Sequence, residues 1–184
     1  HLYRRRQRQM CIRDSYKDAS AYALRALVEF RYGSKDCEKT KSFVKKAIDA
    51  GGSVDTFSIA GSIYKRCSDL KSAISFYKNA LQLAPNDNGF FITKNLIAAY
   101  YQNNDLVSIE RMIVPKLDVK DIDPVMLGFY SYVLLTKGKH EDAKKFFLKA
   151  KEKGLTRKRL SLFVNYKKVL DEFIEKLKPL GSLD

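Results

Sequence analysis

The sequence is poor in the residues on which many enzymes and small disulfide-rich domains depend. Its 184 residues include no tryptophan, three cysteines, two histidines and four prolines. So few cysteines do not build a disulfide scaffold, and so few cysteines and histidines leave little for a metal site. No apolar run approaches the roughly 18 residues that a membrane-spanning helix needs. No glycine-rich phosphate-binding loop is found along the sequence.

Apolar and basic residues, in contrast, are abundant. Hydrophobic residues make up 45% of the chain, which is enough to build a core and argues against disorder. The length suits one domain or one array of small repeats. Lysine and arginine number 35 against 21 acidic residues, so the formal net charge is +14. Such a charge favours an acidic partner, an anionic membrane surface or RNA over a cationic partner.

The first fifteen residues differ in character from the rest. The stretch from Arg5 to Ser15 resembles the translation of a transposase sequencing adapter, and His1 falls on the adapter's upstream codon. We therefore interpret residues 1–15 as a non-native scar, expected to be disordered or a frayed extension of the first helix, and exclude it from fold reasoning. The scar carries five arginines and one aspartate, which reduces the net charge of the remainder to +10. On this interpretation the natural N-terminus is missing. The sequence then leaves the cellular compartment undetermined, and we take the cytoplasm as the default. An upstream domain of the natural protein is compatible with this interpretation.

Residues 54–87 carry the clearest internal pattern. Small and bulky apolar residues recur at helical spacing on both sides of a polar break, and a proline ends the run. These positions are Phe57, Gly61, Tyr64, Ala73, Tyr77, Ala80 and Pro85. The pattern resembles the tetratricopeptide repeat, whose helices carry bulky, small and aromatic residues and then Ala, aromatic, Ala and a closing Pro. The resemblance implies an all-α fold, a right-handed superhelical solenoid of helix-turn-helix repeats.

Less regular copies flank this one, so we expect about four helical hairpins, at residues 16–52, 53–87, 88–123 and 124–154. Pro115 falls late in the second helix of the third copy and is expected to shorten or kink it. After Gly154 an apolar stripe runs from Leu160 to Leu177. It predicts one long C-terminal capping helix within residues 155–184. Thr156 would cap the start of this helix. The polar face of the helix would point to solvent and so end the stack of repeats.

The residues that could support catalysis are few and scattered. His140 stands at the expected start of a helix, where a surface or capping role is common, and a catalytic base needs a placed partner. Cys37 and Cys67 lie near helix–helix turns, and nothing beside them marks an activated thiolate, so we interpret both as small inert side chains. We expect no enzyme activity, no cofactor, no metal and no small-molecule substrate.

Binding is the function that the resemblance implies. The first helices of such an array line a concave groove that takes an extended peptide or a partner helix. The groove positions would be Asp55, Ser58, Ser62, Lys65, Lys94, Ala98, Tyr101 and Tyr132, with Gly128 and Leu135 beside the last. Tyr101 and Tyr132 are the preferred anchors, since tyrosine offers both a ring and a hydroxyl. Lys94 and Asn95 resemble part of the carboxylate clamp of some family members, but the other clamp positions do not match.

Positive charge is concentrated near the C-terminus. The candidate basic face comprises Lys144, Lys145, Lys149, Lys153, Arg157 and Lys158. It is either a solubilising helix face, which we favour, or an attraction site for an acidic partner. The leading hypothesis is a non-catalytic adaptor that binds a protein. The alternatives are a pentatricopeptide-like RNA-binding protein, and the repeat portion of a larger enzyme or signalling protein; nucleic acid is the less favoured partner.

Overall fold

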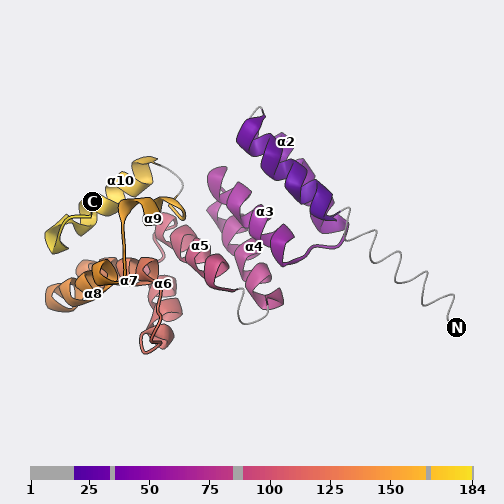
Figure 1. Cartoon of the computed structure of the whole chain (residues 1–184). Coiled ribbons are helices and arrows are strands. Elements are labelled where there is room, and N and C mark those ends of the chain that lie inside the picture. The colour runs from indigo at the N-terminus through magenta and orange to yellow at the C-terminus, as the bar shows by residue number, and fades with distance from the viewer. Residues whose placement is uncertain (1–18, 34–35, 85–88, 165–166, 184) are drawn as a thin grey trace, which may run out of the picture. The chain divides into compact units, whose positions relative to one another are not determined.

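The computed structural model is all-helical over the residues that it describes, which are 19–33, 36–84, 89–164 and 167–183 (Figure 1). Residues 1–15, interpreted above as an adapter scar, lie outside these described residues. The chain divides into two compact units, residues 1–93 and residues 94–184, and each is described by itself. The sequence-based expectation of an all-α fold made of helical hairpins is confirmed.

Unit 1 contains two successive helical hairpins. A helix over residues 19–32 precedes α2 (Cys37–Asp49), and α3 (Val54–Arg66) pairs with α4 (Leu70–Leu83). The side chains of Asp36, Ser53 and Asp69 each accept a backbone N–H at the start of the following helix, which satisfies donors that the helix leaves unpaired. A shared core joins the two hairpins; its buried members are Ala26, Phe43, Val44, Ala60 and Ile63.

The α3–α4 hairpin is held at a close approach of its two helices. Gly61 on α3 faces the ring of Tyr77 on α4, and Tyr77 is fully buried. Ala73 and Ala80 flank Tyr77 on α4 and are also fully buried. Small residues here let the helix axes approach, and the aromatic ring fills the space between them.

Unit 2 begins within α5 (Gly89–Gln102), which is followed by α6 (Leu106–Ile113) and by the 3₁₀ turn η1 (Val114–Lys116). Pro115 lies in η1, so the expected shortening of this helix is observed. The next hairpin pairs α7 (Pro124–Thr136) with α8 (His140–Glu152). All residues of α7 from Pro124 to Leu134 are buried, because other helices of unit 2 cover it on several sides.

The turns inside the hairpins repeat one geometry. Ser68, Asn104 and Gly138 each adopt a left-handed backbone conformation, with φ of 62°, 55° and 73°. In each turn the N–H of the following residue donates to the carbonyl five residues earlier, at 2.9 to 3.0 Å. This hydrogen bond closes the first helix and directs the chain into the second, so the hairpin is set locally.

The C-terminal region corrects one prediction. The single long helix expected after Thr156 is wrong: the structure has α9 (Arg157–Ser161), α10 (Lys167–Leu177) and the 3₁₀ turn η2 (Lys178–Leu180). Thr156 does cap α9, as its side chain accepts the N–H of Arg159. The break has a packing reason: the chain turns after α9, and this brings Phe173 of α10 against rings of α5 and α7.

The close approach at Gly61 gives a testable prediction. A methyl group added at Gly61 would lie 2.7 Å from a ring carbon of Tyr77. Gly61→Ala is therefore expected to lower the free energy of unfolding by about 1–3 kcal/mol, measured by urea denaturation. Gly128→Ala is the matched control. Its nearest neighbour is a flexible methyl of Leu155 at 3.0 Å, so a smaller loss is expected. An unchanged midpoint for Gly61→Ala would contradict this packing.

Candidate partner-binding surface

The predicted groove positions of α3 lie on one face of that helix but differ in accessibility. Asp55 is exposed, whereas Ser58 and Ser62 are half-buried. The hydroxyl of Ser62 shares a hydrogen bond of 3.1 Å with the phenol of Tyr77, which ties the groove face to the hairpin core. Asp55 and Ser58 are thus the α3 positions with polar groups open to a partner.

Lys65, the fourth predicted groove position on α3, is buried. Its exposed fraction is 1%, and its ammonium lies 5.8 Å from the centre of the Tyr77 ring. Burial, assisted by the nearby charge of Arg66, lowers the pKa of Lys65 to about 7. The side chain therefore belongs to the interior of unit 1 and does not present a charge to a groove ligand.

The helix over residues 19–32 adds positions that the sequence analysis missed. Burial on this helix follows the same spacing as on α3, with an offset of 37 residues. The matching buried residues are Ala19, Ala23 and Ala26 on the first helix and Thr56, Ala60 and Ile63 on α3. The spacing of small and apolar residues was the signal available in the sequence, but the ambiguous register of this copy prevented its alignment with α3.

The offset identifies the accessible positions of this first helix. Ala21 is equivalent to Ser58, and Arg25 is equivalent to Ser62. Both Ala21 and Arg25 are exposed, and the guanidinium of Arg25 lies 4.6 Å from the ring centre of Phe43. The contact with the ring orients the Arg25 side chain while leaving it accessible to a partner.

We call Ala21, Arg25, Asp55, Ser58 and Ser62 the unit 1 surface. These residues come from the first helices of two successive hairpins, whose buried sides share one core. The set combines one cation, one anion, two hydroxyls and one small apolar side chain that leaves room for an approaching backbone. Such a mixture suits recognition of a peptide through a few directed polar contacts.

Lys94, in unit 2, has a structural role. Its ammonium donates to Asp123 Oδ2 at 2.8 Å, and the two side chains are only 14% and 9% exposed. The other oxygen of Asp123 accepts the N–H of Val125 at 2.8 Å and so caps α7. The Lys94 ammonium also lies 4.7 Å from the ring centre of Phe163. This lysine links α5 to the start of α7, and its charge is neutralised by Asp123.

The remaining predicted groove positions of unit 2 are buried as well, except Leu135, which is half-buried. Ala98 is fully buried, and Tyr101 and Tyr132 are 8% and 6% exposed. Burial, with the nearby Tyr132 and Glu172, raises the pKa of the Tyr101 phenol above its ordinary value. The side chain that covers both tyrosines is Phe173 of α10, with ring-centre distances of 4.8 Å to Tyr101 and 5.6 Å to Tyr132.

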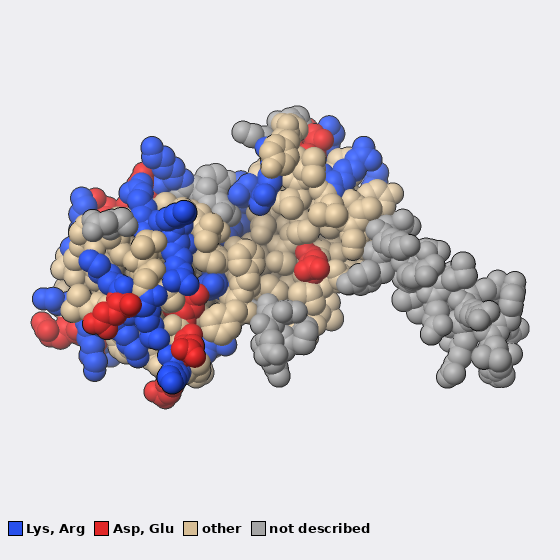
Figure 2. Space-filling view, viewed as in Figure 1, with Lys and Arg blue, Asp and Glu red and all other residues tan. Residues whose placement is uncertain are grey.

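The candidate basic face is partly engaged in contacts inside unit 2. Arg157 forms an ion pair with Asp171, and the Lys153 ammonium donates to the Lys120 carbonyl at 2.9 Å. Lys144, Lys145 and Lys158 are exposed, and Lys149 is half-buried. Figure 2 shows lysine and arginine side chains gathered over the part of the molecule that holds unit 2, with acidic side chains between them. Three exposed lysines are therefore the accessible portion of this face.

Comparison with known families decides the identity of the repeat. The sequence profile of the tetratricopeptide repeat family matches residues 55–87, which span α3 and α4. The α3–α4 hairpin is therefore a tetratricopeptide repeat. Its structure is similar to a solved structure of PilF from Pseudomonas aeruginosa, with a TM-score of 0.61 over 93% of this chain and 80% of that chain. The two sequences are 16% identical, so the likeness shows the shared fold alone. Comparison with curated proteins finds no match.

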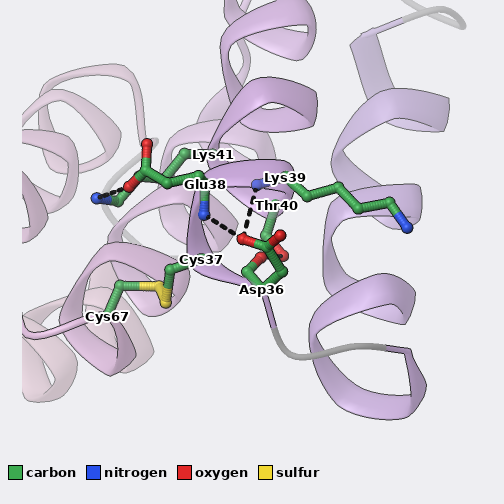
Figure 3. The surroundings of a disulfide bond; sticks show 7 residues. All are labelled: Asp36, Cys37, Glu38, Lys39, Thr40, Lys41 and Cys67. Carbon is green, nitrogen blue, oxygen red and sulfur yellow. Dashed lines mark hydrogen bonds and ion pairs between the residues drawn. A yellow bond between two sulfur atoms is a disulfide. The ribbon is translucent and has the colours of Figure 1, made fainter.

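The chain also contains a disulfide that the sequence analysis missed. Cys37 begins α2 and Cys67 follows the last residue of α3, and their Cα atoms are 5.9 Å apart (Figure 3). The interpretation of both cysteines as inert thiols is therefore wrong. The bond links the second helix of one hairpin to the first helix of the next. Because disulfides persist mainly in oxidising compartments, it argues against the cytoplasmic default.

The described part of the chain has neither a metal-binding cluster nor a membrane-spanning helix. No group of three or more His, Cys, Asp or Glu side chains there could hold a metal ion. None of the described helices has both the length and the apolar character needed to cross a membrane. His140, the one histidine outside the scar, is exposed as the first residue of α8.

The burial of Lys65 predicts a pH dependence of stability. Its pKa is about 7 in the folded chain and 10.5 when unperturbed, so the unfolded chain holds the proton more tightly. The cost of burying the charge is complete below pH 7 and disappears as the pH rises towards 10.5. Lys65→Met is thus expected to stabilise the protein by about 1–4 kcal/mol at pH 6 and by less at pH 10, measured by urea denaturation.

A substitution at an exposed lysine provides the control for this measurement. Lys71 on α4 is exposed, so Lys71→Met should change stability little and equally at both pH values. A stabilisation by Lys65→Met that is the same at pH 6 and pH 10 would contradict the lowered pKa of Lys65.

Proposed function

We propose that this tetratricopeptide-repeat protein is a non-catalytic interaction module that binds a peptide or partner helix on the unit 1 surface. The tetratricopeptide repeat is a protein-interaction fold, and the repeat at residues 55–87 supplies part of this surface. The observation that carries the proposal is the exposure of Arg25 and Asp55, while Tyr101 and Tyr132 on the first helices of unit 2 are covered by Phe173 of α10. Arginine is one of the residue types that most often dominate such interfaces.

Substitutions on the unit 1 surface test this proposal. A partner captured by the immobilised full chain is identified and then titrated calorimetrically against variants. Arg25→Ala and Asp55→Ala are expected to weaken binding about tenfold, which corresponds to about 1.4 kcal/mol. Lys71→Ala on α4 and Asp49→Ala at the end of α2 are the matched controls. They remove the same charges at exposed positions and should leave the affinity unchanged. Circular dichroism verifies that all variants are folded.

Two results would count against the proposal. The first is equal affinity for all four variants, which would remove the unit 1 surface from the interface. The second is tight binding to single-stranded RNA that falls steeply with salt and is insensitive to Asp55→Ala. That second result would favour the RNA-binding alternative, which the matched repeat and its helix anchors do not support.

The basic face is the basis of a second, finer proposal: it attracts an acidic segment of the same partner. Lys144, Lys145 and Lys158 are exposed and make no ion pair within the described residues. Exposed charges of this kind act mainly on association rates and are screened by salt.

Charge reversal tests this electrostatic role. The variant carrying Lys144→Glu and Lys145→Glu is expected to associate several-fold more slowly at low salt, with the difference lost at high salt, in stopped-flow or surface-binding kinetics. A variant with Lys45→Glu and Lys71→Glu changes the net charge equally at exposed positions of unit 1. If both pairs slow association equally, net charge and not the basic face is responsible.

A further inference from the structure

The apolar side of α10 lies on aromatic rings that come from two different hairpins of unit 2. Phe173 is fully buried, and its ring centre lies 4.8 Å from Tyr101 on α5, 4.8 Å from Phe129 and 5.6 Å from Tyr132, both on α7. Tyr101 and Tyr132 also contact one another edge to face, at 5.3 Å. The three rings thus form one continuous apolar receiving face, which we call the ring face.

The position of α10 differs from that of a helix that only closes the end of an array. A closing helix needs to cover the last hairpin, here α7 and α8. By reaching Tyr101 on α5, α10 extends across the first helices of two successive hairpins. Those first-helix faces are where the tetratricopeptide resemblance places a ligand. A segment of the chain itself therefore lies where a partner would bind.

The contacts of α10 have the chemistry of a helix bound in a groove. Leu170, Phe173 and Leu177 recur at helical spacing on its buried side, whereas Lys168, Glu172 and Glu175 are exposed. The Lys176 ammonium lies 5.7 Å and 5.4 Å from the ring centres of Tyr101 and Tyr132, which adds a cation–π contact at the rim. Such a pattern of apolar anchors with a charged back is how an amphipathic helix binds a hydrophobic groove.

We propose that the ring face of α5 and α7 is a helix-binding surface, and that α10 is its built-in ligand. A partner that presents an amphipathic helix with one aromatic residue binds the ring face by displacing α10. This inference extends the proposed interaction function to a second surface and names the class of its partner. Because α10 is tethered, its effective local concentration is high, so the partner helix must outcompete it. Unit 2 is consequently closed in the isolated chain.

The experiment uses the full chain and a labelled synthetic peptide with the sequence of residues 167–183. Phe173→Ala in the chain removes the main anchor of the built-in helix and leaves the three receiving rings intact. The Phe173→Ala chain is expected to bind the peptide at least about tenfold more tightly than the wild-type chain, measured by fluorescence anisotropy. A second peptide with alanine at the Phe173 position should not bind.

Phe146→Ala is the matched control, since it removes another aromatic residue of unit 2. Phe146 packs on Tyr130, at 5.0 Å between ring centres, and makes none of the ring contacts with Phe173 described above. The Phe146→Ala chain should bind the peptide no better than the wild-type chain does. Equal binding by the wild-type, Phe173→Ala and Phe146→Ala chains would overturn the proposal.

Hydrogen exchange on the unmodified chain tests whether α10 can leave the ring face, even if the Phe173→Ala chain does not fold. A built-in ligand that can leave its site opens independently of the hairpin beneath it. We therefore expect the amides of α10 to exchange at least about tenfold faster than those of α7. Equal protection of α10 and α7 would make α10 a permanent part of the core and would overturn the proposal. Neither experiment involves the unit 1 surface. Failure of the ring-face proposal is therefore distinguishable from failure of the proposed function.

Discussion

The packing of a small residue beneath an aromatic ring is the interaction on which the α3–α4 hairpin depends. On α3 and α4 it joins Gly61 to Tyr77, and in unit 2 the fully buried Ala143, Phe147 and Ala150 of α8 repeat the second-helix part of the motif. A larger side chain at the small position would separate the helix axes, and a smaller one at the ring position would leave a cavity. Both halves of the contact are therefore needed for α3 and α4 to pair closely.

The same chain uses its groove positions in two different ways. In unit 1 the first-helix faces stay accessible, and only Lys65 is taken into the interior. In unit 2 the lysine of the groove face, Lys94, is paired with Asp123, and the two tyrosines are covered by Phe173. Residues of binding type are thus covered in unit 2 of the isolated chain and accessible in unit 1. Sequence position alone does not distinguish these uses, because ion pairs and ring contacts depend on segments that are distant along the chain.

The disulfide adds a covalent link between the two hairpins of unit 1. Cys37 at the start of α2 and Cys67 after the end of α3 join the first hairpin to the second. Closing a loop of about thirty residues restricts the unfolded chain and contributes on the order of 3 kcal/mol. In sequence the two cysteines look unrelated, since nothing local indicates that one helix begins beside the end of another.

Local information was enough to predict the all-α fold, the hairpins and the turns between their helices. Helical spacing and capping side chains such as Thr156 act within a few positions of one another, so they can be identified from the sequence. The break between α9 and α10, the burial of Lys65, the Lys94–Asp123 pair and the cover over Tyr101 and Tyr132 were decided only in three dimensions. Each of these features depends on which distant segment packs against a given helix face. An apolar stripe in the sequence predicts that a face is buried but does not indicate which segment covers it.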